Sequence, residues 1–141
     1  MTRQDPLHGF RFLIEIGGIR VGGFMRVKGL SREVKHESVR EGGVNDYEHK
    51  LVTQIVYPSL VLERGLAQDG LWNWISDVSN GDIERKSIRI VLQDKDATDR
   101  WIWYADHAYP VKWSVSDLDA SASQVTVESV EFAHHGLRRG T

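Results

Sequence analysis

The stretch FRFLIEIGGIRVGGFMRV (Phe10–Val27) is the strongest structural signal in this 141-residue chain, and it predicts an antiparallel β-hairpin. Apolar and polar side chains alternate before the first glycines, as they do in a strand that buries one face. Gly17-Gly18 is a typical two-residue hairpin turn. That turn places Glu15 opposite Arg20 as a cross-strand charge pair. The chain is therefore expected to begin as an antiparallel sheet.

The returning strand of the hairpin holds a second glycine pair, Gly22-Gly23. The predicted register pairs Ile14 with Val21, and a glycine pair beyond that point indicates a bulge or a close approach of two backbones. Two more strands are predicted downstream, at residues 32–39 and at about residues 54–64. In the second of these, Pro58 cannot donate to a ladder and so indicates an edge or a bulge.

A single helix is predicted, at about residues 69–79. Leu71, Trp74, Ile75 and Val78 form its apolar stripe at helical spacing. Asp69 can cap its first turn, and Asn80-Gly81 can end it. Such a short helix is stable only when it packs against the sheet. The expected core aromatic residues are Trp74, Phe12 and Phe132.

The C-terminal half of the chain again has the period of strands, at residues 87–94, 100–117 and 124–137. Tyr109-Pro110 should break the second of these strands. In the third, the apolar phase slips by one residue near Ser129, as a β-bulge would make it. Many alternating strands and one helix favour a mainly β sandwich or barrel. The length allows one domain over residues 1–141, with its core at about 10–137.

Composition excludes several classes of protein. Apolar residues make up 40% and charged residues 27%, which is ordinary for a globular domain. A net charge of −2 gives no reason to expect a nucleic-acid or membrane partner. The absence of cysteine excludes disulfides and thiol chemistry. We expect no signal peptide, no membrane insertion and synthesis in the cytoplasm.

A search of the sequence for a reaction centre finds none, so we expect no enzyme, cofactor or metal. His134 and His135 are neighbours in a predicted strand and should point to opposite faces. A metal-dependent enzyme using His135 with Glu131 stays an alternative, which needs a third ligand from elsewhere. A carbohydrate-binding sandwich that uses its exposed tryptophans is a further alternative.

The polar stretch REGGVNDYEHK, residues 40–50, has neither helical nor strand period. Loops of this length in small domains are uncommon and usually functional or disordered. The alternatives are therefore a plain surface loop and an arm that becomes ordered against a partner.

Five segments, taken in order, resemble the tail tube (inner tube) proteins of contractile phage tails and extracellular contractile injection systems, which are related to type VI secretion tube proteins. These segments are GGFMRVKGL (22–30), VREGGVND (39–46), LVLERG (60–65), AYPVKW (108–113) and VESVEFAHHGL (127–137). The resemblance covers nearly the whole chain. It implies two packed antiparallel sheets forming a barrel-like sandwich with one flanking α-helix.

The resemblance also implies an assembly and its partners. Six copies would form a ring, and rings would stack into a rigid conduit for DNA or effector cargo that sheath contraction drives out. Baseplate and tube-terminator proteins would bind its ends, and the chain would belong to a virion tail or an injection particle. A tube-initiator ring on the baseplate is the alternative role.

The resemblance assigns two sets of surface residues. The loop that would reach a neighbouring subunit or ring comprises Arg40, Glu41, Gly42, Gly43, Asn45, Asp46 and Tyr47. The polar side of the helix, with Asn73 and Asp77, would face the sheath.

Overall fold

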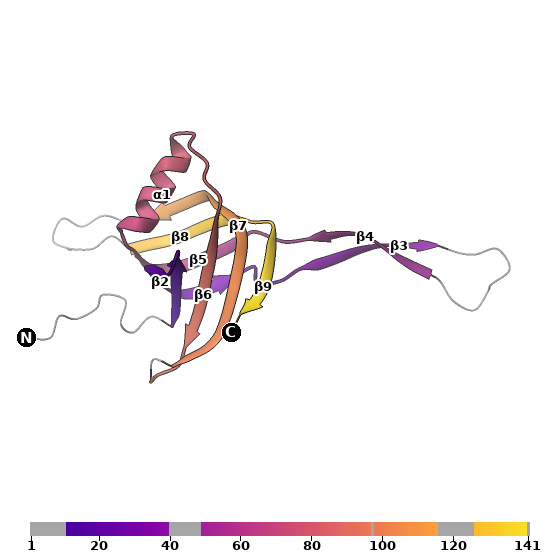
Figure 1. Cartoon of the computed structure of the whole chain (residues 1–141), viewed down its shortest axis with the longest axis horizontal. Coiled ribbons are helices and arrows are strands. Elements are labelled where there is room, and N and C mark those ends of the chain that lie inside the picture. The colour runs from indigo at the N-terminus through magenta and orange to yellow at the C-terminus, as the bar shows by residue number, and fades with distance from the viewer. Residues whose placement is uncertain (1–10, 40–48, 97, 116–125, 141) are drawn as a thin grey trace, which may run out of the picture.

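The computed structural model describes residues 11–39, 49–96, 98–115 and 126–140, which form a β-barrel with a long hairpin projecting from it (Figure 1). The barrel strands are β1 (Phe12–Ile16), β2 (Ile19–Lys28), β5 (Leu60–Ala67), β6 (Lys86–Gln93), β7 (Asp99–Val115) and β8 (Thr126–Ala133). They run in the order β6-β1-β2-β5-β8-β7, and a β6–β7 pairing closes the cylinder. β9 (Gly136–Gly140) adds to β7. The predicted mainly β, barrel-like fold with a flanking helix is confirmed.

The first hairpin forms as predicted except at one position. Glu15 faces Arg20 across the Gly17-Gly18 turn, whereas Ile14 pairs with Gly22 and not with Val21. Val21 is therefore the extra residue of a bulge, one position before the predicted glycine pair. The bulge has a structural use, because the Val21 carbonyl accepts a 2.8 Å hydrogen bond from the Gln68 amide at the start of the helix.

The predicted strand at residues 54–64 is in fact two strands that belong to different parts of the molecule. β4 (His49–Val56) pairs only with β3 (Glu33–Val39) among the described strands, and together they form the projecting hairpin. β5 starts at Leu60 in the barrel wall. Pro58 lies between them, where the chain leaves one sheet for the other, because it has no amide hydrogen for a ladder.

The helix α1 spans Asp69–Ser79, as predicted, but its N-cap is Gln68 and not Asp69. Gln68 makes no side-chain capping bond. Asp69 instead lies in the first turn, where its negative charge is favourable to the helix dipole. α1 packs against the barrel at the top of Figure 1 through Leu71, Trp74 and Ile75, which are all buried.

β7 passes through Tyr109-Pro110 without ending, so the predicted break there is wrong. The strand is irregular on either side of that pair: His107 has a positive φ of 52°, and the register with β8 shifts between Pro110 and Lys112. The described pairing with β6 ends at Ala108. Beyond it β8 is the one described strand that pairs with β7, and a proline is tolerated where one edge of a strand is open.

The last predicted strand, residues 124–137, is interrupted rather than continuous. β8 and β9 follow the same edge of β7 in one register, from Tyr109 opposite Ala133 to Asp106 opposite Gly136. His134-His135 separates the two strands. The predicted slip near Ser129 is confirmed, because the register with β7 shifts there and leaves one extra residue on β8.

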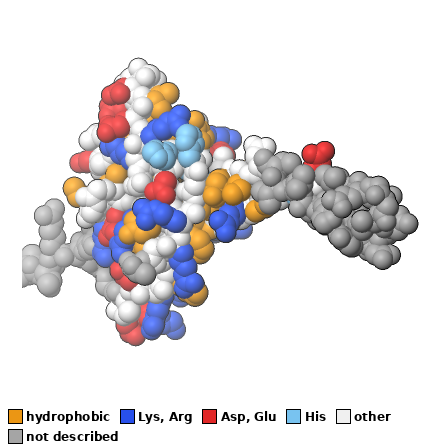
Figure 2. Space-filling model, turned by 45° about the vertical axis from the view of Figure 1, so that its right-hand side comes forward, with side chains coloured by type: hydrophobic (Ala, Val, Ile, Leu, Met, Phe, Trp, Pro, Cys, Tyr) orange, Lys and Arg blue, Asp and Glu red, His pale blue; other side chains and the backbone are white. Residues whose placement is uncertain are grey.

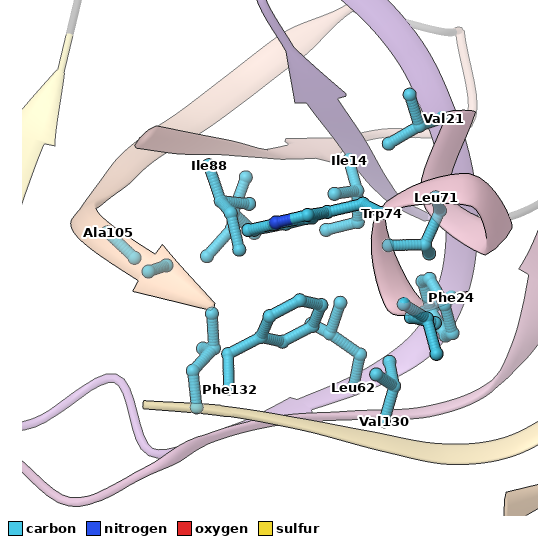
Figure 3. Packing of buried hydrophobic residues seen from close by; sticks show 14 of the residues in the cluster. Ile14, Val21, Phe24, Leu62, Leu71, Trp74, Ile88, Ala105, Val130 and Phe132 are labelled. Carbon is cyan, nitrogen blue, oxygen red and sulfur yellow. The ribbon is translucent and has the colours of Figure 1, made fainter. Parts of the chain in front are cut away.

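The core lies where α1 closes over the barrel interior (Figure 3). The rings of Trp74 and Phe132 are buried, with centroids 5.5 Å apart. The Trp74 indole Nε1 donates to the Glu84 carbonyl at 2.8 Å, so its one polar atom is satisfied. Phe12 packs against this cluster and is partly buried.

Candidate functional site

The two adjacent histidines lie between β8 and β9 and contact different neighbours. The His134 ring packs edge-on against Tyr57, and its Nε2 lies 3.1 Å from the Pro58 carbonyl oxygen. His135 is exposed on another part of the surface, with its ring 5.8 Å from that of His107. The two side chains therefore point to different parts of the surface, as the sequence predicted, and their rings do not face a common site.

His135 belongs to a polar cluster around the start of β9. Arg85 Nη1 lies 2.6 Å from His135 Nε2, and a guanidinium can only donate, so this nitrogen accepts. Asp106 accepts from Arg138 Nε at 2.9 Å and from Ser87 Oγ at 3.0 Å. Partial burial alone would raise the pKa of Asp106, but these two hydrogen bonds outweigh it and lower the pKa. The cluster fastens β9 to β6 and β7.

The described residues were expected to hold no metal-binding cluster. Within them, no three His, Cys, Asp or Glu side chains gather closely enough to hold a metal ion. Glu131 lies opposite Val61 of β5 and Lys112 of β7, whereas His135 contacts Arg85 and His107.

The most prominent surface is the β3–β4 hairpin, which we call the arm. It extends well away from the barrel (Figure 1), and Val34 and Ile55 are cross-strand partners near its base. Each of these side chains is about half exposed, and hydrophobic side chains gather where the arm leaves the barrel (Figure 2). A two-stranded ribbon with exposed apolar residues is marginally stable alone and gains stability against a partner.

The predicted loop residues Arg40, Glu41, Gly42, Gly43, Asn45, Asp46 and Tyr47 lie outside the described residues. The described ends of the arm, Val39 and His49, are the positions between which this segment runs. His49 and Lys50, expected in the loop, belong to β4. The helix residues Asn73 and Asp77 are both exposed, on the side of α1 away from its buried face.

Sequence reasoning missed the open edge of β9. β9 pairs with β7, and no described strand pairs with its other edge. Four aromatic or basic side chains stack in pairs along it: Arg138 lies over Tyr104 at 4.2 Å, and Arg139 lies over Trp101 at 4.4 Å. Residues 138–141 (RRGT) are polar and follow the last predicted strand at 124–137, so no spacing in the sequence indicated a strand there.

Within the part of the chain that the structure describes, no helix has the length and apolar character needed to cross a bilayer.

Comparison with known families gives a match over nearly the whole chain. The family model described as T4-like virus tail tube protein gp19 matches residues 8–138. No curated protein sequence matches the chain significantly.

Solved structures show the same fold. A chain in the baseplate of the anti-feeding prophage (AFP), solved by cryo-electron microscopy with six-fold symmetry, is 29% identical with a TM-score of 0.71, and the match covers 98% of this chain and 97% of that one. A chain of the PVC sheath–tube complex, from an extracellular contractile injection system in the extended state, is 22% identical with a TM-score of 0.70 and coverages of 96% and 91%. Hcp1 from Flavobacterium johnsoniae is 15% identical with a TM-score of 0.57 and coverages of 93% and 95%.

Proposed function

Because this chain belongs to the family of T4-like virus tail tube proteins, we propose that six copies form a ring and that rings stack into the inner tube of a contractile tail or injection particle. The family match over residues 8–138 is the observation that carries the proposal. The role is structural rather than catalytic: the tube is a rigid conduit for DNA or protein cargo. Assembly takes place in the cytoplasm, before the particle acts.

Two features of the fold support assembly. A strand edge such as that of β9 is an aggregation hazard in a monomer, and pairing with a neighbouring copy removes the hazard. The apolar side chains Val34 and Ile55 on the arm gain burial only against another surface. Closed symmetric rings satisfy both needs, because each subunit presents the same edge and the same arm.

The exposed side of α1, with Asn73 and Asp77, is proposed to contact the sheath. Baseplate and terminator proteins would bind the first and last rings of the tube. The loop at residues 40–47, carried on the arm, is proposed to reach a neighbouring subunit or ring.

Purified protein is expected to form hollow rings or tubes, and negative-stain microscopy across a concentration series measures this. Symmetric self-association should make the particle length rise with concentration. A monomer that persists at the highest concentration, with no hollow particle in the images, would sink the proposed function. Glycan binding by such a monomer would point to the carbohydrate-binding alternative.

Deleting Gly42–Glu48 is expected to prevent stacking while the barrel stays folded, because the core residues of the barrel all belong to other parts of the sequence. Microscopy should then show single rings or unassembled chains, with an unchanged melting temperature of the barrel. In a control variant, Gly42–Glu48 is replaced by a Gly/Ser segment of equal length. This variant keeps the length of the loop but removes its side chains. Normal tube growth by the deletion variant would refute the role of the loop.

A tube-initiator ring is the second candidate function. The observation that favours it is the baseplate structure, which is more similar in sequence, at 29% identity, than the sheath–tube complex at 22%. An initiator would form rings that do not lengthen by themselves at any concentration. The same concentration series therefore separates the two roles.

A further inference from the structure

A cavity of about 420 Å³ lies between β9 and the chain that enters the arm. Leu30 and Arg32 line it from the arm side, and Trp103, Leu137, Arg138 and Arg139 line it from the β7–β9 side. The described lining holds three arginines and neither Asp nor Glu. We call this cavity the β9 pocket.

Two of the three arginines in the β9 pocket are available to a ligand. Arg138 is already engaged, since it donates to Asp106 at 2.9 Å. Among the described residues, no carboxylate forms an ion pair with Arg32 or Arg139. Arg139 is instead held in place over the Trp101 ring at 4.4 Å. A guanidinium that is positioned but unpaired is a ready site for a carboxylate.

The floor of the β9 pocket is apolar. Leu30, Trp103 and Leu137 are partly buried and pack against the main core cluster. The open backbone edge of β9 runs alongside, with no described partner. The ligand that this combination suits is a short protein segment with an apolar side chain between two carboxylates.

The chain itself contains such a segment, at residues 116–125, with the sequence SDLDASASQV. Asp117 and Asp119 flank Leu118, and the ten residues include no lysine or arginine. Two other stretches place an apolar residue between carboxylates, Asp46-Tyr47-Glu48 and Asp82-Ile83-Glu84. Both are less suited because basic residues follow them directly, His49-Lys50 in the first case and Arg85-Lys86 in the second. Charge complementarity therefore favours residues 116–125.

The segment cannot reach the pocket of its own subunit. Trp103 and Val115 lie twelve positions apart in β7, which is about 40 Å along the path of the strand. Leu118 is three residues beyond Val115 and so can lie at most about 10 Å from it. In Figure 1 the end of β7 and the start of β8 lie on the opposite side of the barrel from β9. Only a second copy can supply the segment.

We propose that the β9 pocket binds Asp117-Leu118-Asp119 of a neighbouring copy, with Arg32 and Arg139 on the two carboxylates and Leu118 over Trp103. The inference rests on the proposed function, because it names one contact through which the copies assemble. Pocket and segment are different surfaces of the subunit, so the contact is heterologous and propagates from copy to copy into a ring or a stack.

A labelled peptide with the sequence SDLDASASQV tests the pocket without any need for assembly. It is titrated by fluorescence anisotropy into the full chain, at a protein concentration where light scattering detects no particles. We expect saturable binding that weakens about tenfold or more in the Arg32→Gln/Arg139→Gln variant, and by a similar factor when both aspartates of the peptide are asparagine. The control is Arg26→Gln/Arg100→Gln, which removes two exposed arginines elsewhere, each paired with a carboxylate. Binding that is absent, or that the control weakens equally, overturns the proposal.

Assembly gives the second readout. The Asp117→Asn/Asp119→Asn variant should need about tenfold more protein than the wild type to form particles. If the wild type forms tubes but the peptide does not bind and the Asp117/Asp119 variant assembles normally, this inference fails and the proposed function stands. If the wild type forms no particle, the proposed function fails, and the peptide titration still decides the pocket.

Discussion

Phe132→Ala is expected to lower the free energy of unfolding by about 3–5 kcal/mol, because it empties the centre of the core. Phe132 is fully buried, and its ring lies against Trp74, one of the three buried residues through which α1 packs against the barrel. Its strand is held on both sides, opposite Leu60 of β5 and Pro110 of β7, so the surrounding backbone has little freedom to collapse into the space. The transfer cost of the ring and the cost of the cavity therefore add.

Chemical denaturation of the unassembled chain measures this loss. Met25→Ala is the control, since Met25 is 64% exposed and its truncation should change the free energy of unfolding by less than about 0.5 kcal/mol. A Phe132→Ala variant that unfolds at the denaturant concentration of the wild type would show that the described core does not hold the barrel together.

Gly65→Ala is expected to destabilise the barrel by about 1–3 kcal/mol, although it adds a single methyl group. A Cβ at Gly65 would lie 2.1 Å from the Gly23 carbonyl oxygen and 2.4 Å from the Phe24 ring. Strands β2 and β5 pair here, with Gly65 opposite Phe24, so the added atom has to push two paired backbones apart. The glycine pair in the first hairpin thus marks a close backbone approach, as the sequence suggested.

Thermal melting monitored by circular dichroism compares this variant with Gly136→Ala. At Gly136 the nearest atoms to an added Cβ belong to the Tyr57 side chain, at 3.9 Å and 4.0 Å, so no atom has to move. Gly65→Ala should melt several degrees lower, while Gly136→Ala should stay close to the wild type. Equal melting temperatures would show that β2 and β5 can separate at no cost.

Much of the fold could be predicted from the sequence, because several elements are specified by the spacing of residues within one short segment. The hairpin across Gly17-Gly18, the helix from its apolar stripe and the bulge near Ser129 each follow from spacing within one short segment. The errors arose where distant contacts override such signals. Val21 forms the bulge because its carbonyl binds Gln68, and Pro110 stays in β7 because that part of the strand has a single described neighbour.

One of the two proposed binding surfaces could be predicted from the sequence, and the other could not. The exposed side of α1 was predictable, since residues opposite an apolar stripe face solvent. The β9 pocket was not, because its lining comes from three places in the chain: the start of the arm, β7 and β9. Nothing in the local pattern of LRRG shows that Arg139 stacks on Trp101 or that Arg32 lies nearby.

By itself, the sequence determined the strand-rich class, the single predicted helix, the absence of disulfides and the family, because alternation, helical spacing, composition and motif order are properties of neighbouring residues. Tertiary structure alone decided that residues 54–64 divide at Pro58 between the arm and the barrel, and that β9 lies along β7 with one edge open. The pairing of strands depends on burial and hydrogen bonding between segments far apart in the chain. The local sequence of one strand therefore does not specify which strand it will pair with.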